Sequence, residues 1–426
     1  MASILIYTSP ARGHLFPILG PALELRSRGH DVHIRTLAPE VERVRSLGLY
    51  AKPIAPQVEA RELDDWKAKN PMQALAFSMK TFGDRAVLEV DDVREALRET
   101  QADALLVDTN SWGAQAVAEA SGRPWAIFQP YFTALPAPGV PPFGPGLARS
   151  TSLFGRMRDA LLGWIIFSKM NGAALPPINE TRRRLGLDPL EDITAFQLRP
   201  PRVFYFTAKA FEYPRDQWPE NFRFVGPGTW APPAQPPGWL DDIERPIALV
   251  TCSSEKQNDR QIVEAALQIL PEQGYFVVAT SAAYEPEGLD VKLNGNARLE
   301  RFIPHDPIIE RASVVICHGG MGITQRALSQ GVPVVTIPFG RDQLEVARRV
   351  EHAQSGVRLM PKLLNVSNLS AAVQEALSKR DGAARIADAF ARAGGESAVA
   401  DGIEEVLGVS MDRARAEFVV PERFET

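Results

Sequence analysis

The sequence predicts an α/β protein with two domains, each built on a parallel sheet covered by helices. At 426 residues the chain is too long for one ordinary hydrophobic core, so two domains of roughly 200 residues are the natural division. In both halves, short apolar runs alternate with segments of helical periodicity, the order typical of βαβ units. A connector with five prolines, residues 227–239, separates the halves. We therefore expect two Rossmann-like domains that face each other across a cleft.

The connector sets the expected domain boundaries. Residues 1–226 form the predicted N-terminal domain, 227–239 the linker and 240–409 the C-terminal domain, and 410–426 remain as a C-terminal tail.

The composition is that of a globular, soluble protein, with 45% hydrophobic and 23% charged residues. A net charge of −5 without a long basic run argues against a nucleic-acid partner. The N-terminus leads directly into an apolar run with no basic region before it, so we expect no signal peptide, no stable membrane insertion and a cytoplasmic location. Cys252 and Cys317 each close an apolar run, which indicates reduced core residues.

The first half opens as a βαβ unit, with apolar strands predicted at residues 3–8 and 31–37. His14 lies where the first strand gives way to a helix, and ligands of open α/β sheets gather at the carboxyl ends of strands. Asp108 follows another buried strand, residues 102–107, of the same sheet. Taken alone, His14 is more often a solvated or capping residue, and Asp108 a helix cap. Two strands of one sheet would nevertheless bring them together.

A proline-dense loop follows the next predicted strand, over residues 130–145. It carries Tyr131, Phe132 and Phe143, and the helix after it has an aromatic and methionine-rich face that includes Trp164. On composition alone, such a face is usually part of a core.

In the second half, a buried strand at residues 313–317 stops at a glycine-rich turn, residues 318–322, before a helix. Glycines let backbone N–H groups approach a ligand closely, and the start of a helix offers unpaired N–H groups and a positive dipole end. His318 adds a donor. The turn therefore suits a phosphate, although glycine-rich turns are also common as purely structural elements.

A second strand, residues 332–338, ends at a polar turn in which Asp342 stands beside Gln343. A carboxylate next to a carboxamide offers several acceptors and two donors to hydroxyl groups. A diphosphate in one turn and a polyol in the next suggest a nucleotide sugar.

The ordered string FIPH, HGGMG, RAL, GVP and PFGRDQ, within residues 298–343, resembles the donor-binding signature of the family 1 glycosyltransferases, which have the GT-B fold. Its bacterial branch, which glycosylates antibiotics and macrolides, is the most similar. The likeness is dense over this stretch and looser over most of the chain. In GT-B folds the last helix packs back on the first domain, which implies the same place for the tail.

The resemblance implies a role for each candidate residue. His14 is similar to the general base of these enzymes, and Asp108 to the aspartate that orients it. The implied ligands of the diphosphate are Ser253, Ser254, His318, Gly319, Gly320, Gly322 and Thr324. The base and ribose would contact Phe302, Ile303, His305 and Arg326, and the sugar Asp342 and Gln343. The acceptor pocket would include Tyr131, Phe132, Phe143 and Trp164.

The chain departs from this signature at an informative place. UDP-sugar users of the family tend to have Ser five residues and Glu eight residues after the turn histidine, and here these positions hold Ile323 and Arg326. Without the carboxylate a ribose 2′-hydroxyl loses an acceptor, which favours a dTDP donor. Alternatively, Arg326 is an exposed helix residue and the ribose is held elsewhere.

We therefore expect an inverting glycosyltransferase that moves a sugar from a nucleotide diphosphate sugar, with a dTDP-deoxysugar favoured, to a hydroxyl of a hydrophobic natural-product aglycone. The implied diphosphate donors are neutral or dipolar, so no metal and no cofactor are expected. A monomer or a homodimer is equally compatible. The alternatives are a UDP-glucose-type transferase of small lipophilic acceptors, an NDP-sugar 2-epimerase of GT-B shape and a non-catalytic transferase-like helper protein.

Overall fold

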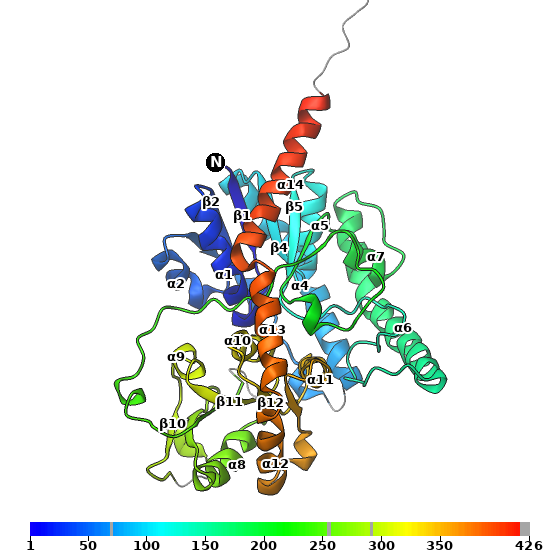
Figure 1. Cartoon of the computed structure of the whole chain (residues 1–426). Coiled ribbons are helices and arrows are strands. Elements are labelled where there is room, and N and C mark those ends of the chain that lie inside the picture. Colours follow the sequence, from blue (N-terminus) through cyan, green and yellow to red (C-terminus); the bar gives the residue numbers. More distant parts are fainter. Residues whose placement is uncertain (69–70, 254–256, 290–292, 418–426) are drawn as a thin grey trace, which may run out of the picture.

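The computed structural model describes residues 1–68, 71–253, 257–289 and 293–417, and these contain two parallel sheets (Figure 1). The first has the order β3-β2-β1-β4-β5-β6-β7, with β1 (Ser3–Tyr7), β2 (Asp31–Thr36), β3 (Tyr50–Pro53), β4 (Ala104–Asp108), β5 (Trp125–Gln129), β6 (Val203–Tyr205) and β7 (Phe222–Phe224). The second has the order β10-β9-β8-β11-β12-β13, with β8 (Ile247–Thr251), β9 (Phe276–Thr280), β10 (Ala297–Glu300), β11 (Ala312–Cys317), β12 (Val334–Thr336) and β13 (Gly356–Arg358). The predicted α/β architecture with two sheets is confirmed.

Each sheet reverses its strand order once, between β1 and β4 in the first and between β8 and β11 in the second. The central strands are buried on both faces, as their apolar sequences predict. The loops after such neighbouring strands part at the reversal and leave a crevice at the carboxyl edge of the sheet, where open α/β sheets bind ligands. Both predicted half-sites lie at these two reversals.

Helices cover both sheets. Those of the first half are α1 (Arg12–Ser27), α2 (Val41–Ser46), α3 (Pro56–Glu59), α4 (Pro71–Thr100), α5 (Trp112–Ala120), α6 (Leu153–Arg184) and α7 (Ile193–Leu198). Those of the second half are α8 (Gln261–Ile269), α9 (Asp306–Ile309), α10 (Met321–Ser329), α11 (Gln343–His352), α12 (Val366–Leu377), α13 (Arg380–Arg392) and α14 (Gly395–Glu417). Cys252 and Cys317 are buried free thiols in the second half.

The chain returns to the first domain through α14, which runs alongside α1 (Figure 1). Val399 and Ile403 are fully buried in the hydrophobic core of the first sheet, and Arg28, directly after α1, pairs with Asp401 and Glu404 at 2.7 and 2.9 Å. The return thus begins at Gly395, whereas the sequence pattern assigned residues up to 409 to the second domain. The apolar face of α14 has ordinary helical spacing, so the sequence does not show which of the two domains it packs against.

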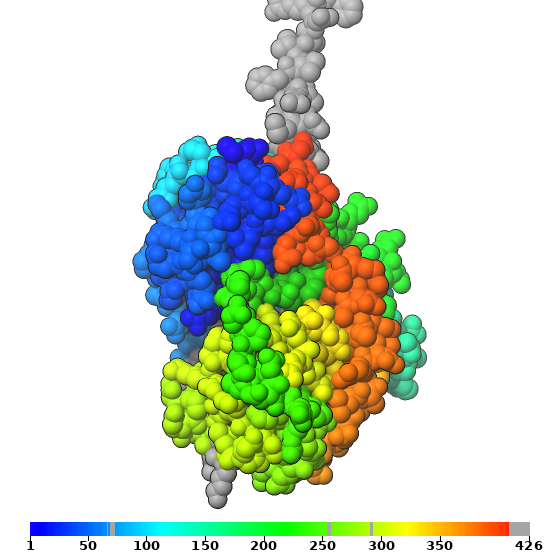
Figure 2. Space-filling view, turned by 60° about the vertical axis from the view of Figure 1, so that its left-hand side comes forward, coloured from blue at the N-terminus to red at the C-terminus, as the bar shows by residue number. Residues whose placement is uncertain are grey.

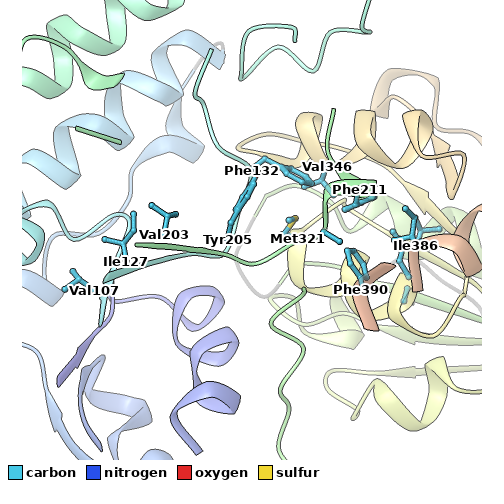
Figure 3. Packing of buried hydrophobic residues seen from close by; sticks show 14 of the residues in the cluster. Val107, Ile127, Phe132, Val203, Tyr205, Phe211, Met321, Val346, Ile386 and Phe390 are labelled. Carbon is cyan, nitrogen blue, oxygen red and sulfur yellow. The ribbon is translucent and has the colours of Figure 1, made fainter. Parts of the chain in front are cut away.

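The two domains share a buried contact region beside the linker. Figure 3 shows Phe132 and Tyr205 of the first domain in one cluster with Val346 and Phe390 of the second. The linker, residues 227–239, runs over the outer surface of the second domain, where Figure 2 shows it in green. The relative position of the two half-sites is therefore set by a packed interface and not by the linker alone.

Candidate active site

The acceptor-side half-site is built on the ends of β1 and β4. The two strands pair in parallel, so the first turn of α1, which carries His14, lies beside the last residue of β4, Asp108. His14 Nδ1 lies 2.8 Å from Asp108 Oδ2. The carboxylate is fully buried and also accepts the backbone N–H groups of Ser9 at 3.3 Å and Asn110 at 2.8 Å. These bonds fix its direction.

The imidazole of His14 is 17% exposed, so the ring is reachable although most of it is covered. Burial lowers the pKa of His14, but the negative charge of Asp108 and the hydrogen bond to it raise the pKa by more, so the net pKa is above its ordinary value. The charge of Asp342, from the second domain, acts in the same direction. The acceptor side and the donor side therefore converge within electrostatic range at this histidine.

The second ring nitrogen of His14 has a neighbour that the sequence pattern did not reveal. Asn110 Nδ2 lies 3.4 Å from His14 Nε2, and the Tyr131 hydroxyl donates to Asn110 Oδ1 at 2.6 Å. The Tyr131 ring also meets the imidazole edge to face, with centroids 5.9 Å apart. Tyr131, predicted to contact the acceptor, thus adjoins the candidate base. In the sequence, Asn110 could be singled out only by its position two residues beyond Asp108, at the end of a strand.

On the donor side, β11 ends at the glycine turn. Gly319 has φ +84°, a left-handed conformation that glycine adopts without strain, and Gly320 is the extended residue before α10 with no side chain over the helix start. A Cβ on Gly320 would collide with the imidazole of His318. The His318 imidazole therefore lies next to the N-terminus of α10, an arrangement that suits a phosphate.

His318 is an uncharged donor in this turn. Burial, and secondarily the positive charge of Arg341, lower the pKa of His318 to about 4. Among the described residues, its Nδ1 is buried and has no hydrogen-bond partner. The nearest carboxylate oxygen among them, Asp259 Oδ2, lies 4.0 Å from this nitrogen, and a buried polar atom without a hydrogen bond costs free energy.

The loop after β8 completes this side. The Ser253 N–H donates to Asp259 Oδ2 at 2.6 Å, and its hydroxyl accepts from Gln257 Nε2 at 2.8 Å. Gln257 also accepts from Gln343 of the polar turn. It therefore ties the predicted diphosphate loop to the predicted sugar loop, a link that sequence reasoning missed. The predicted ligand Ser254 lies outside the described residues.

On the nucleobase side, the structure rules out one of the two interpretations of Arg326. The Phe302 ring is 83% exposed, Ile303 is buried, and His305 Nε2 lies 3.2 Å from Thr280 Oγ1. Burial and the charge of Arg326 lower the pKa of His305 to about 4. Arg326 is not an exposed helix residue, because its side chain is 21% exposed and its Nη1 lies 3.1 Å from Asp306 Oδ1.

Two predicted donor ligands need correction. Thr324 is fully buried below the turn, where its hydroxyl lies 3.8 Å from Cys317 Sγ, so it is turned away from any diphosphate. Gln343 is 2% exposed, and its Oε1 accepts the N–H groups of Phe339 at 2.8 Å and Gly340 at 3.2 Å. Its carboxamide shapes the sugar loop and is not free to hold a sugar. Asp342 beside it is half-buried, and burial raises its pKa.

Three predicted acceptor ligands are also placed differently. Phe132 is fully buried at the domain interface, with the guanidinium of Arg349 3.9 Å from its ring centroid. Trp164 of α6 is 70% exposed, and Phe143 packs against the core. An aromatic residue in a loop is equally suited to a core, an interface or a pocket, and only the fold decides among them. Tyr131 keeps its place beside the candidate base.

Known proteins similar to this chain carry the same architecture. Residues 267–406 match the family described as Erythromycin biosynthesis protein CIII-like, C-terminal domain. The 4'-demethylrebeccamycin synthase of Lentzea aerocolonigenes is 29% identical over 428 residues, covering 96% of this chain and 99% of that protein. The crystal structure of CalG4, the calicheamicin glycosyltransferase, has a TM-score of 0.74 at 22% identity and covers 96% of this chain and 99% of that one. SsfS6 of Streptomyces sp. SF2575, solved with thymidine diphosphate, has a TM-score of 0.67 at 20% identity, covering 95% and 100%.

The fold, the two facing half-sites and these similarities define a glycosyltransferase of GT-B fold. Within that class, residues 267–406 match the Erythromycin biosynthesis protein CIII-like C-terminal domain, and similar proteins of known structure include antibiotic glycosyltransferases. No helix in the described part of the chain is long and apolar enough to cross a membrane.

Proposed function

We propose that the enzyme transfers a sugar, with inversion at the anomeric carbon, from a dTDP-deoxysugar to a hydroxyl of a hydrophobic natural-product aglycone. The observation that carries this mechanism is the 2.8 Å contact between His14 Nδ1 and Asp108 Oδ2. A neutral ring bonded in this way carries its hydrogen on Nδ1, and the lone pair of Nε2 is left to receive a proton.

His14 Nε2 takes the proton of the acceptor hydroxyl while the oxygen attacks the anomeric carbon opposite the diphosphate. The new C–O bond forms as the bond to the diphosphate oxygen breaks, and its electron pair leaves with the diphosphate. His318 and the backbone N–H groups of Gly319 and Gly320 meet that growing charge, and Asp108 stabilises the imidazolium. These groups are supplied by the chain itself, so the proposal gives no role to a metal ion.

Asp342 is the proposed sugar ligand, because its carboxylate lies within electrostatic range of His14, where the anomeric carbon has to meet the acceptor oxygen. Phe302 is the proposed platform for the pyrimidine, because its exposed ring offers a free face for stacking. The proposed acceptor contact is Tyr131, at the edge of the imidazole.

The preference for dTDP rests on Arg326. At the position where similar UDP-sugar users have Glu, the chain has a guanidinium, which offers only donors. A ribose 2′-hydroxyl buried against it would lack an acceptor, whereas deoxyribose has no such hydroxyl. The structure of SsfS6 in complex with thymidine diphosphate supports the same choice by analogy of fold.

A UDP-sugar is the second candidate donor, and Asp306 is the observation that favours it. Arg326 is paired with the carboxylate of Asp306 at 3.1 Å, so an acceptor for ribose hydroxyls lies close to the guanidinium after all. The two candidates therefore predict different roles for Asp306: only with a UDP-sugar does its carboxylate accept hydrogen bonds from the ribose hydroxyls.

Calorimetric titration with free dTDP and free UDP separates the two candidates. An unpaired buried hydroxyl costs about 1–3 kcal/mol, so the unmodified protein should bind dTDP roughly 5- to 150-fold more tightly than UDP. Arg326→Glu should narrow or reverse this gap, because the carboxylate accepts from both ribose hydroxyls. Equal binding of the two diphosphates, with a selective loss of UDP binding in Asp306→Ala, would establish the UDP donor instead.

The assignment of the base is tested with His14→Ala. Turnover should fall by roughly 10²- to 10⁴-fold, the usual span for loss of a positioned base, while dTDP binding stays nearly intact. His33→Ala is the matched control, because His33 stacks on Tyr50, with centroids 4.8 Å apart, away from the dyad. Unchanged turnover of His14→Ala with a hydroxyl acceptor would disprove the mechanism.

A further inference from the structure

Asn110 contacts His14 Nε2, the atom that takes the acceptor proton in the proposed reaction. Its side chain is buried, its Nδ2 lies 3.4 Å from His14 Nε2, and its own backbone N–H is bonded to the carboxylate of Asp108. It therefore touches both members of the dyad, from a turn that directly follows β4.

The direction of the Asn110 amide is set by Tyr131. The Tyr131 hydroxyl donates to Asn110 Oδ1 at 2.6 Å, and burial raises the pKa of this phenol, so it stays protonated and remains a donor. With Oδ1 occupied by a donor, the NH2 group faces the imidazole. His14 Nδ1 carries the hydrogen shared with Asp108, so Nε2 presents a lone pair to that NH2 group.

The contact between Asn110 Nδ2 and Nε2 is a weak one. At 3.4 Å it is longer than the usual 2.9–3.0 Å of an N–H hydrogen bond, so an incoming oxygen can displace it at little cost. An oxygen about 2.8–3.0 Å from both nitrogens would accept from Nδ2 and donate to Nε2. A hydroxyl group has the hydrogen and the lone pairs that this position requires.

We propose that Asn110 positions the acceptor hydroxyl, by donating from Nδ2 to the nucleophilic oxygen while the proton of that oxygen passes to His14 Nε2. One lone pair of the oxygen accepts from Asn110 and the other is directed at the anomeric carbon. The C–O bond forms there, the bond to the diphosphate breaks, and Asn110 itself neither gains nor loses a proton. The inference rests on the proposed role of His14 as base.

This arrangement also selects the acceptor atom. Oxygen is a strong hydrogen-bond acceptor and a thioether or thiol sulfur a weak one, so the Asn110 bond favours oxygen over sulfur nucleophiles. A residue that merely kept the turn folded would support both acceptors alike. The ratio of oxygen to sulfur transfer therefore reports the positioning role separately from folding.

The kinetic test uses dTDP-glucose with 2-naphthol or 2-naphthalenethiol. Asn110→Ala should lower kcat/KM for the naphthol roughly 5- to 150-fold and change the value for the thiol much less. Tyr131→Phe, which frees the amide to turn, should shift the ratio in the same direction by a smaller factor. Equal losses for the two acceptors, or no loss for the naphthol, would overturn the inference.

Gln115→Leu provides the matched structural control. Gln115 is also a buried amide; it lies in α5, and its Nε2 donates to two backbone oxygens of the turn, those of Asp108 at 3.2 Å and Thr109 at 2.9 Å. Because its amide bonds only to the backbone of the turn in these two contacts, its loss should lower both rates by the same factor. A changed ratio in Gln115→Leu would show that loosening the turn alone produces the effect, and would overturn the inference.

The pKa of His14, followed by NMR, is independent of turnover. Asn110→Asp puts a carboxylate beside Nε2 and should raise this pKa, whereas Asn110→Ala should leave it nearly where it is. An unchanged pKa in Asn110→Asp overturns the contact, whatever the enzyme transfers. Failure of the proposed function has a different signature, namely full turnover in His14→Ala.

Discussion

Arg349 is the cation of a buried charge cluster between the two domains. Its side chain is 2% exposed; Nε lies 2.8 Å from Glu212 Oε2, and Nη1 lies 2.9 Å from Glu345 Oε2. The two carboxylates are 0% and 3% exposed. We predict that Arg349→Met, which keeps an unbranched apolar chain but removes the charge, leaves the two buried carboxylates without the guanidinium that pairs with both.

The magnitude follows from this burial. Removing one partner of a buried ion pair costs about 3–5 kcal/mol, whereas exposed pairs are worth at most about 1 kcal/mol. Buried carboxylates without a cation have a pKa above the unfolded value of about 4.3, so the folded variant binds protons more strongly than the unfolded chain. Its stability is then lost as the pH rises. The deficit should be small at pH 5 and complete at pH 8.

Urea unfolding followed by far-UV circular dichroism at both pH values tests this reasoning. Arg184→Met is the control, because Arg184 is 55% exposed and pairs with Glu180 on the surface of α6 at 3.0 Å. Adding Glu345→Gln to Arg349→Met should restore part of the stability at pH 8, since one of the two charges is removed. A deficit below about 1 kcal/mol at pH 8, or the same deficit at both pH values, would refute the argument.

Three further predictions concern single groups. Asp108→Asn should lower the maximal rate and move the acidic limb of the pH–rate profile to lower pH, because the charge that raises the pKa of His14 is gone; an unmoved limb would contradict this. Burial raises the pKa of Glu89 to about 8, so stability falls as the pH rises from about 4.3 to that value. Glu89→Gln should therefore shift the urea midpoint little at pH 5 and upward at pH 9, and equal shifts would count against it. Gly320→Ala should weaken dTDP binding, because the new Cβ would displace the turn histidine. Gly322→Ala should weaken it less, because a Cβ there would meet no atom within 4 Å. Calorimetric titration with dTDP compares the affinities of the two variants.

The elements and their order could be predicted from sequence because strands buried on both faces are short, continuous apolar runs. Such runs placed His14, Asp108 and the turn at His318 at the carboxyl ends of strands, and the parallel order of the sheets then brings them to the two strand reversals. The pairing of β1 with β4 could only be expected by analogy. This pairing is what places His14 beside Asp108.

Contacts between loops could not be predicted in this way. Asn110 looks like an ordinary turn residue in the sequence, and its approach to His14 depends on how the turn after β4 meets the first turn of α1. Gln343 beside Asp342 suggested a pair of sugar ligands, but adjacent side chains at a helix start point in different directions, and the amide serves its own loop. Arg349 and Glu345 have the spacing of a surface pair on a helix, and only the docking of the domains buries them.

One helix joins the two halves of the site. α11 begins directly after Asp342, the proposed sugar ligand, and its first turns carry Glu345, whose Oε1 accepts the N–H groups of Gly144 at 2.8 Å and Gly146 at 2.9 Å. These glycines end the proline-rich loop that starts beside Tyr131. A displacement of α11 would therefore move the sugar loop and strain the acceptor loop together. The backbone hydrogen bonds to this one carboxylate therefore link the donor position to the acceptor position.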